Sequence, residues 1–128
     1  MLFDTDVLIW AQRKKADAFE LIGNASERFI SVQSYMELLQ GARNHSEIHV
    51  IKSFLSEADF QTLPLTENIG HRALIYIEEY ALTAGLRSAD AIIAATAVEN
   101  NLALATSNQK HFKAVKELKL HVFFSARS

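Results

Sequence analysis

The sequence predicts one α/β domain over residues 1–128: a three-layer α/β/α arrangement around a mainly parallel sheet of four or five strands. Short apolar segments of strand type alternate with longer segments of helical periodicity, and this alternation is typical of parallel α/β sheets. The length of 128 residues is that of one compact domain. Polar residues directly follow several of the apolar segments, at the sheet edge where open α/β folds bind ligands.

Composition narrows the class of protein. Hydrophobic residues make up 49% of the chain, enough for a buried core, while no apolar run approaches a membrane span, so we expect no membrane partner. No signal peptide is expected either. The absence of cysteine excludes disulfides and thiolate metal sites and fits the cytoplasmic location that we expect. Because the net charge is -2, nucleic-acid binding would depend on a local basic patch or on cations that offset the acids.

The first ten residues are the most informative stretch. A short apolar run ends in Asp4 and Asp6, and a helix is predicted from Val7 to Gln12. Either acid can serve as the N-cap of that helix. In the alternative, carboxylates at the end of so short a buried strand indicate a cation beside them. The basic cluster at 13–15 is either a solvated face or a phosphate contact, and a second short helix is predicted over 16–22.

A second strand is predicted over 29–32, and a helix follows it. Ser34 and Glu37 match the S-x-x-E capping box, in which Glu37 folds back onto the backbone of Ser34. In the alternative, the chain turns at Ser31 or Val32, and Glu37 faces the acids of the first strand. The local sequence leaves both alternatives open.

The middle of the chain predicts two helices and an edge strand. The first helix covers 46–58, and the extended segment 60–65 carries the only proline, which favours an edge position. The second helix covers 67–84, with Thr66 as its cap and Gly85 at its end. Its expected core residues are Ile69, Ala73, Ile77 and Tyr80, widened by Leu74 and Ala81, whereas His71, Arg72, Glu78 and Glu79 are expected at the surface.

A helix over 88–98 is apolar nearly all round, which predicts burial. Ser88 is its expected N-cap, and Asp90 in its first turn either complements the helix dipole or requires a partner in a half-buried site. A strand over 102–105 then ends in Thr106-Ser107-Asn108, a polar exit like that of the first strand. A turn or short helix over 109–112, a final strand over 121–124 and a loose tail over 125–128 complete the chain.

Four polar groups fall at or near the ends of buried elements: Asp4, Glu37, Asp90 and Asn108. Three carboxylates in one small cleft repel one another unless a cation lies among them. Oxygen ligands without Cys or a His pair favour Mg²⁺ or Mn²⁺. Such an ion polarises a phosphoryl oxygen and lowers the pKa of bound water, whose proton a carboxylate can accept. The sequence therefore predicts metal-assisted phosphoryl chemistry.

In order and spacing, four motifs resemble those of the PIN domain family, and more narrowly the VapC-type toxin ribonucleases of toxin–antitoxin pairs. The motifs are Asp4-Thr5-Asp6-Val7-Leu8-Ile9, Ser31 to Gly41 with Glu37, Ser88 to Ala95 with Asp90, and Thr106-Ser107-Asn108 followed by His111-Phe112. The resemblance implies a PIN-like fold and an endoribonuclease that hydrolyses RNA with water activated by Mg²⁺ or Mn²⁺. It implies Asp4, Glu37 and Asp90 as catalytic residues, and Asp4, Asp90 and Asn108 as metal ligands.

The resemblance also implies supporting roles. Thr5 and Thr106 place hydroxyls beside the site, and Asp6 orients water or, as we favour, caps the first helix. His111 is structural or contacts phosphate. Asn108 stands where many members carry Asp, and as an amide it ligates more weakly and cannot act as a base. Substrate phosphates would meet a basic rim, which makes RNA binding salt-sensitive; its candidates are Arg13, Lys14, Lys15, Arg43, Arg87 and Lys110.

Two protein partners are implied as well. The first is a cognate antitoxin whose C-terminal segment packs along a groove, often with an Arg near the acids, where its charge competes with metal and substrate. The second is another copy of the chain, because members of the family usually form homodimers.

Three other functions compete with this interpretation. A haloacid dehalogenase-like phosphatase also begins hydrophobic-Asp-x-Asp, but Leu8 stands where Thr or Val is expected. A phospho-receiver domain needs an acid after a middle strand and a late Lys-Pro, whereas Pro64 does not follow a lysine. A PIN domain that binds RNA without cleaving it also remains, because Asn108 weakens the predicted metal site.

Overall fold

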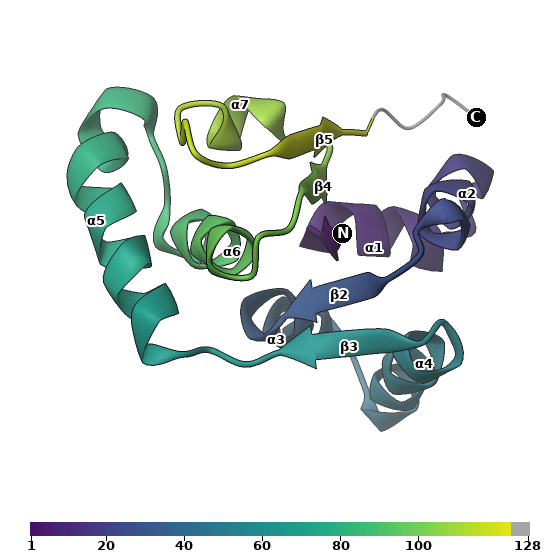
Figure 1. Ribbon diagram of the computed structural model, residues 1–128. Helices are drawn as coiled ribbons and strands as arrows, with labels where there is room; N and C mark the ends of the chain where they lie inside the picture. The colour runs from purple at the N-terminus through teal and green to yellow at the C-terminus, as the bar shows by residue number, and fades with distance from the viewer. Residues whose placement is uncertain (124–128) are drawn as a thin grey trace.

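The computed structural model describes residues 1–123. It contains a five-stranded sheet with helices packed on both of its faces, and Figure 1 shows how the helices surround the strands. The α/β fold with a parallel central sheet, predicted from the sequence, is thereby confirmed. The elements in chain order are β1 (Leu2–Phe3), α1 (Thr5–Gln12), α2 (Ala16–Asn24), β2 (Arg28–Ser31), α3 (Val32–Gln40), α4 (His45–Glu57), β3 (Phe60–Leu63), α5 (Glu67–Ala84), α6 (Ser88–Glu99), β4 (Leu104–Thr106), α7 (Gln109–Phe112) and β5 (Leu120–Val122).

The sheet has the strand order β3-β2-β1-β4-β5, and every pairing in it is parallel. β1 is central, since Leu2 pairs with Phe29 of β2 on one side and with Leu104 of β4 on the other. β3 lies at one edge, as Pro64 just beyond its end predicts. Because the strands are parallel, β1, β2 and β4 all end at the same edge of the sheet, and the polar residues that follow them meet there.

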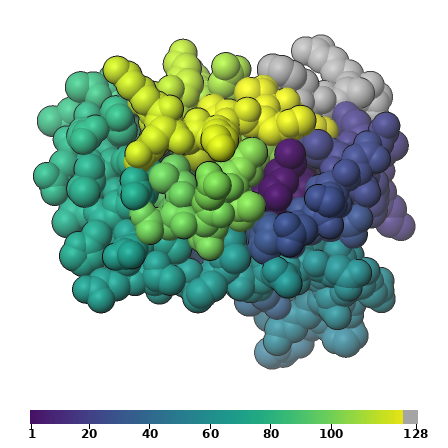
Figure 2. All heavy atoms as spheres, viewed as in Figure 1, coloured from purple at the N-terminus to yellow at the C-terminus, as the bar shows by residue number. Residues whose placement is uncertain are grey.

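Alternate side chains of the strands enter two hydrophobic cores on opposite faces of the sheet. Leu2 and Leu104 belong to the core that packs against α5, α6 and α7. Phe3, Ile30 and Ala105 belong to the core that packs against helices α1 to α4. The two groups of helices therefore cover opposite faces of the sheet, and Figure 2 shows the closely packed outer atoms of one face of the molecule.

Helix α6 is buried, as its apolar sequence predicts. Its alanines at 91, 94, 95 and 97 are fully inaccessible to solvent, and such small side chains let α5 and the sheet approach closely. The expected cap at Ser88 is wrong, because Arg87 has the extended backbone of an N-cap and Ser88 is already helical. No side chain therefore caps this helix.

Helix α5 begins and ends as predicted. The Thr66 hydroxyl accepts a hydrogen bond from Ile69 N, and Gly85 ends the helix with a φ of 70°. Its core face differs: Leu74 is 61% exposed, and Tyr76 is buried in its place because it follows Ala73 on the inner face. Arg72 is also not a free surface residue, since its guanidinium pairs with Glu99 and Glu117.

Several predicted boundaries shift. Helix α1 begins at Thr5 rather than Val7, and α2 continues through Gly23 to Asn24. The final strand is 120–122, whereas Phe124 and the tail 125–128 lie outside the described residues. Among residues 1–123, we find no helix that combines the length and the apolar character needed to cross a membrane.

Candidate functional site

A hollow of about 340 Å³ opens at the carboxyl edge of the sheet. The segments that line it are the start of α1, the middle of α3, the first turn of α6 and the β4–α7 turn. Asp4, Glu37, Asp90 and Asn108, predicted as one constellation, all line this hollow. The other lining residues are Thr5, Asp6, Ile9, Arg87, Ala89, Ile93 and His111.

Asp4 is the buried centre of the site. Its Oδ1 accepts a hydrogen bond from Thr5 N at 2.8 Å, and its Oδ2 accepts one from Thr106 Oγ1 at 2.7 Å. Only 5% of the residue is exposed. Asp4 is therefore the N-cap of α1 and a lining residue of the hollow at once. Burial and, second, the charge of Asp6 raise the pKa of Asp4 to about 7, against the effect of the hydrogen bonds from Thr106 and Thr5.

Glu37 faces the first strand, which decides between the two alternatives left open by the sequence. Ser31 is the N-cap of α3 and accepts a hydrogen bond from Ser34 N, so Ser34 is already helical and the expected capping box does not form. Thr5 Oγ1 instead lies 3.1 Å from Glu37 Oε1 and 2.9 Å from Ser34 Oγ, within hydrogen-bond distance of both. Thr5 thus ties the start of α1 to α3.

Asp90 lies in the first turn of α6 with 18% of its side chain exposed. Burial raises the pKa of Asp90, and the nearby His111 and Arg87 act in the opposite direction. His111 Nδ1 lies 3.5 Å from Asp90 Oδ2, so a protonated His111 pairs with this carboxylate. The sequence left His111 as structural or as a phosphate contact, and its position at the rim of the hollow suits contact with an anionic ligand.

Asp6 does not cap α1, which corrects our preferred role for it. Its Oδ2 accepts hydrogen bonds from the backbone N–H of Ser107, at 3.0 Å, and from the Ser107 hydroxyl. Asn108, next in the chain, donates its N–H to Thr106 Oγ1 at 3.0 Å. Sequence reasoning missed the role of Ser107, although its place in the polar exit Thr106-Ser107-Asn108 was a signal for it.

The predicted basic rim separates into three groups. Arg87 lines the hollow, while Arg13 and Arg43 line an adjoining groove. Arg13 and Lys15 also lie over the Trp10 ring, 5.9 Å and 5.7 Å from its centroid. Lys14, Lys15 and Lys110 line neither cavity.

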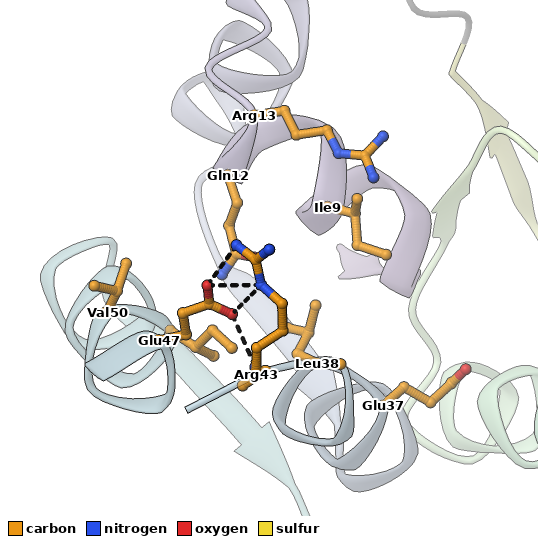
Figure 3. A pocket seen from close by; sticks show the side chains of 11 residues that line it. Ile9, Gln12, Arg13, Glu37, Leu38, Arg43, Glu47 and Val50 are labelled. Carbon is orange, nitrogen blue, oxygen red and sulfur yellow. Dashed lines mark hydrogen bonds and ion pairs between the residues drawn. The ribbon is translucent and has the colours of Figure 1, made fainter. Parts of the chain in front are cut away.

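The adjoining groove, of about 530 Å³, lies between α1, α3 and α4 (Figure 3). Its apolar walls include Ile9, Leu38, Val50 and Ile51, and Figure 3 shows the Arg43–Glu47 ion pair on its α4 side. Gln12 also lines the groove, and its Nε2 is buried with no hydrogen-bond partner among residues 1–123. Ile9 and Glu37 line both cavities, so the groove leads into the hollow.

The residues of the hollow fit a hard divalent cation by the chemistry of their donors. Asp4, Glu37, Asp90 and Asn108 offer carboxylate and amide oxygens, and the pKa of Asp4 is raised by burial and, second, by the negative charge of Asp6, which a cation would offset. Among the described residues, however, no three Asp, Glu or His side chains are close enough together to hold an ion as they stand. Binding therefore requires the carboxylates to move inward.

The raised pKa of Asp4 predicts how stability depends on pH when no metal is bound. A group whose pKa is raised by folding stabilises the protein fully below its unfolded pKa, 3.8 for Asp4, and this contribution is lost as the pH rises through about 7. Asp4→Asn keeps the cap acceptor but removes the charge. We expect the fall in the free energy of unfolding between pH 5 and pH 8 to be smaller in this variant by about 2 kcal/mol.

Urea denaturation with a chelator measures this difference, and the exposed carboxylate variant Asp59→Asn is the control. An equal fall in wild type and Asp4→Asn would contradict the assignment.

Comparison with known proteins places the fold. The PIN domain family model matches residues 1–118. A toxin–antitoxin complex from Klebsiella pneumoniae contains a chain with 26% identity and a TM-score of 0.82, over 98% of both chains. VapBC2 from Rickettsia felis, bound to a promoter DNA fragment, matches at 21% identity and a TM-score of 0.80, over 96% of this chain and 98% of that one.

DNA-bound VapBC from Salmonella typhimurium matches at 21% identity and a TM-score of 0.80, over 94% of this chain and 96% of that one. A search of curated protein sequences gave no match. The neighbours agree with the resemblance found in the sequence, and because the family model covers nearly the whole described chain, the protein belongs to the PIN domain family.

Proposed function

We propose that this protein is a VapC-type toxin that acts as a metal-dependent endoribonuclease. The observation that carries the proposal is the convergence of Asp4, Glu37, Asp90 and Asn108 on one hollow in a PIN fold. The neighbouring structures support it, because they include toxin–antitoxin complexes that match over nearly their whole length.

Each side chain of the hollow has a distinct task in RNA hydrolysis. A bound Mg²⁺ or Mn²⁺ supplies Lewis acidity toward a phosphoryl oxygen and toward water. Asp4, Asp90 and Asn108 would hold the cation, with Asp4 oriented by Thr106. Glu37 is oriented by Thr5 and accepts the proton of the attacking water, a task that the neutral amide of Asn108 cannot perform. Arg87 at the rim contacts the substrate phosphate.

The rival functions have less support. The chain belongs to the PIN family rather than to the haloacid dehalogenases. The order β3-β2-β1-β4-β5 also differs from the 2-1-3-4-5 order of receiver domains. A PIN domain that binds RNA without cleaving it is separated from a nuclease by the cleavage assay below.

We expect cleavage of single-stranded RNA with Mn²⁺ or Mg²⁺ and none with a chelator. Asp4→Asn, Glu37→Gln and Asp90→Asn should each lower the rate on the order of 10²-fold or more, because each removes an acid that binds the cation or accepts a proton. Glu20→Gln, on the exposed side of α2, is the matched control and should keep full activity. Gel-based cleavage of a labelled RNA measures the rates, and circular dichroism verifies folding. Full cleavage by the folded Asp4 and Asp90 variants would refute the catalytic assignment.

The groove supports an antitoxin as the protein partner. Its apolar walls suit a peptide segment that supplies aliphatic side chains. Since Ile9 and Glu37 belong to both cavities, such a segment ends beside the acids of the hollow.

We expect Val50→Asp to abolish co-purification with the product of a small adjacent reading frame while leaving RNA cleavage unchanged. Val50 is 59% exposed, so the substitution should not disturb the core. His49→Asp, an exposed neighbour that does not line the groove, should still co-purify. If Val50→Asp still co-purified with the partner, the partner would bind outside this groove.

The outer face of α5 supports a homodimer. Leu74, Ile75 and Leu82 are 61%, 51% and 101% exposed, an unusual concentration of large apolar side chains on one solvent-facing helix. Burying these side chains against a second copy removes them from water.

Light scattering after size exclusion should therefore give about twice the monomer mass of 14.4 kDa for wild type. Leu74→Glu should give the monomer mass, because a charge would then lie in the interface, whereas Phe19→Glu, an equivalent change on α2, should remain dimeric. If Leu74→Glu remained a dimer, the outer face of α5 would not be the dimer interface.

A further inference from the structure

Asp6 lines the hollow with the other acids and also holds the neighbouring strand exit. It lies in the first turn of α1, and its Oδ2 accepts both hydrogen bonds that Ser107 donates. Ser107 stands between Thr106, whose hydroxyl donates to Asp4, and Asn108. Asp4 and Asp6 at the exit of β1 therefore fix two consecutive residues at the exit of β4.

This tether does not by itself require a carboxylate. An asparagine at position 6 has an amide oxygen that can accept the same two hydrogen bonds. The second carboxylate oxygen, Oδ1, is buried and has no hydrogen-bond partner among residues 1–123. An unpaired buried oxygen is unfavourable, and a negative charge close to Asp4 adds repulsion. The tether to Ser107 thus leaves Oδ1 and the charge of Asp6 without a structural role.

We propose that Asp6 is a positioning residue of the metal site, whose oxygen fixes the Thr106–Asn108 turn and whose charge strengthens cation binding without ligating the ion. This inference rests on the proposed metal-dependent function. Asn108 brings an oxygen but no charge to the hollow, and Asp6, hydrogen-bonded to the same turn, brings a charge. The two residues together supply what a single carboxylate at position 108 would supply alone.

Two variants separate the two contributions. Asp6→Asn removes the charge and keeps an acceptor for Ser107, whereas Ser107→Ala removes one donor and keeps the charge. Isothermal titration of the full chain with MnCl₂, without RNA, measures the dissociation constant, and thermal unfolding in chelator measures the stability of the metal-free protein. Asp59→Asn, a carboxylate remote from the hollow, is the control.

We expect Asp6→Asn to weaken Mn²⁺ binding about 10-fold with no loss of metal-free stability, and Ser107→Ala to lower metal-free stability with a smaller effect on affinity. The double variant Asp6→Asn/Asn108→Asp should recover the affinity, because it restores the number of charges at the turn. If Asp6 were merely structural, Asp6→Asn would lower the stability of the metal-free protein without changing the dissociation constant for Mn²⁺.

This inference fails if wild type and Asp6→Asn bind Mn²⁺ with equal affinity, or if the double variant does not recover the affinity. Either result leaves the proposed function standing. Absence of Mn²⁺ binding by wild type overturns the proposed function and this inference with it.

Discussion

The hydrogen bond from Thr106 to the buried carboxylate of Asp4 joins the ends of the two central strands, and the rest of the site is arranged around it. Backbone hydrogen bonds connect the same strand ends: Asp4 N donates to Ala105 O at 2.9 Å, and Phe123 N donates to Thr106 O at 2.8 Å. Both oxygens of Asp4 are occupied, so the side chain cannot turn away. A buried carboxylate with a raised pKa lowers the stability of the fold above that pKa, and destabilising groups of this kind are typical of functional sites.

The other two acids are held by different forces. Asp90 is fixed by packing, because residues 93–97 of α6 are buried and the helix cannot rotate without disturbing both α5 and the sheet. Glu37 is held by its hydrogen bond with Thr5, on a helix whose start Ser31 fixes at the end of β2. Hydrogen bonding, packing and capping thus bring three elements to one edge. The side chains still have room to close, which fits the absence of a ready-made ion site among residues 1–123.

What the sequence could predict was local or periodic. Helix α5 from Thr66 to Gly85 was predictable because cap, periodicity and glycine stop all lie within the segment. The convergence of Asp4 and Asn108 followed from parallel topology, which brings strand ends together. The start of α3 was not predictable, because Ser31 and Ser34 are both good caps and only the pairing of β2 with β1 and β3 decides where the strand ends. The polar exit marked Ser107 as a candidate, but its pairing with Asp6 was not predictable, since that contact joins residues far apart in the chain.

The continuity of groove and hollow bears on how such a protein could be controlled. Glu37 faces the hollow, where it is tied to Thr5, yet it also lines the groove that Ile9 and Val50 wall. A peptide occupying the groove therefore needs no conformational change to influence the acids, because one positive side chain at its end would satisfy the charge that otherwise attracts a cation. On the proposed function, one occupant of the groove would thus also reach the acids of the hollow.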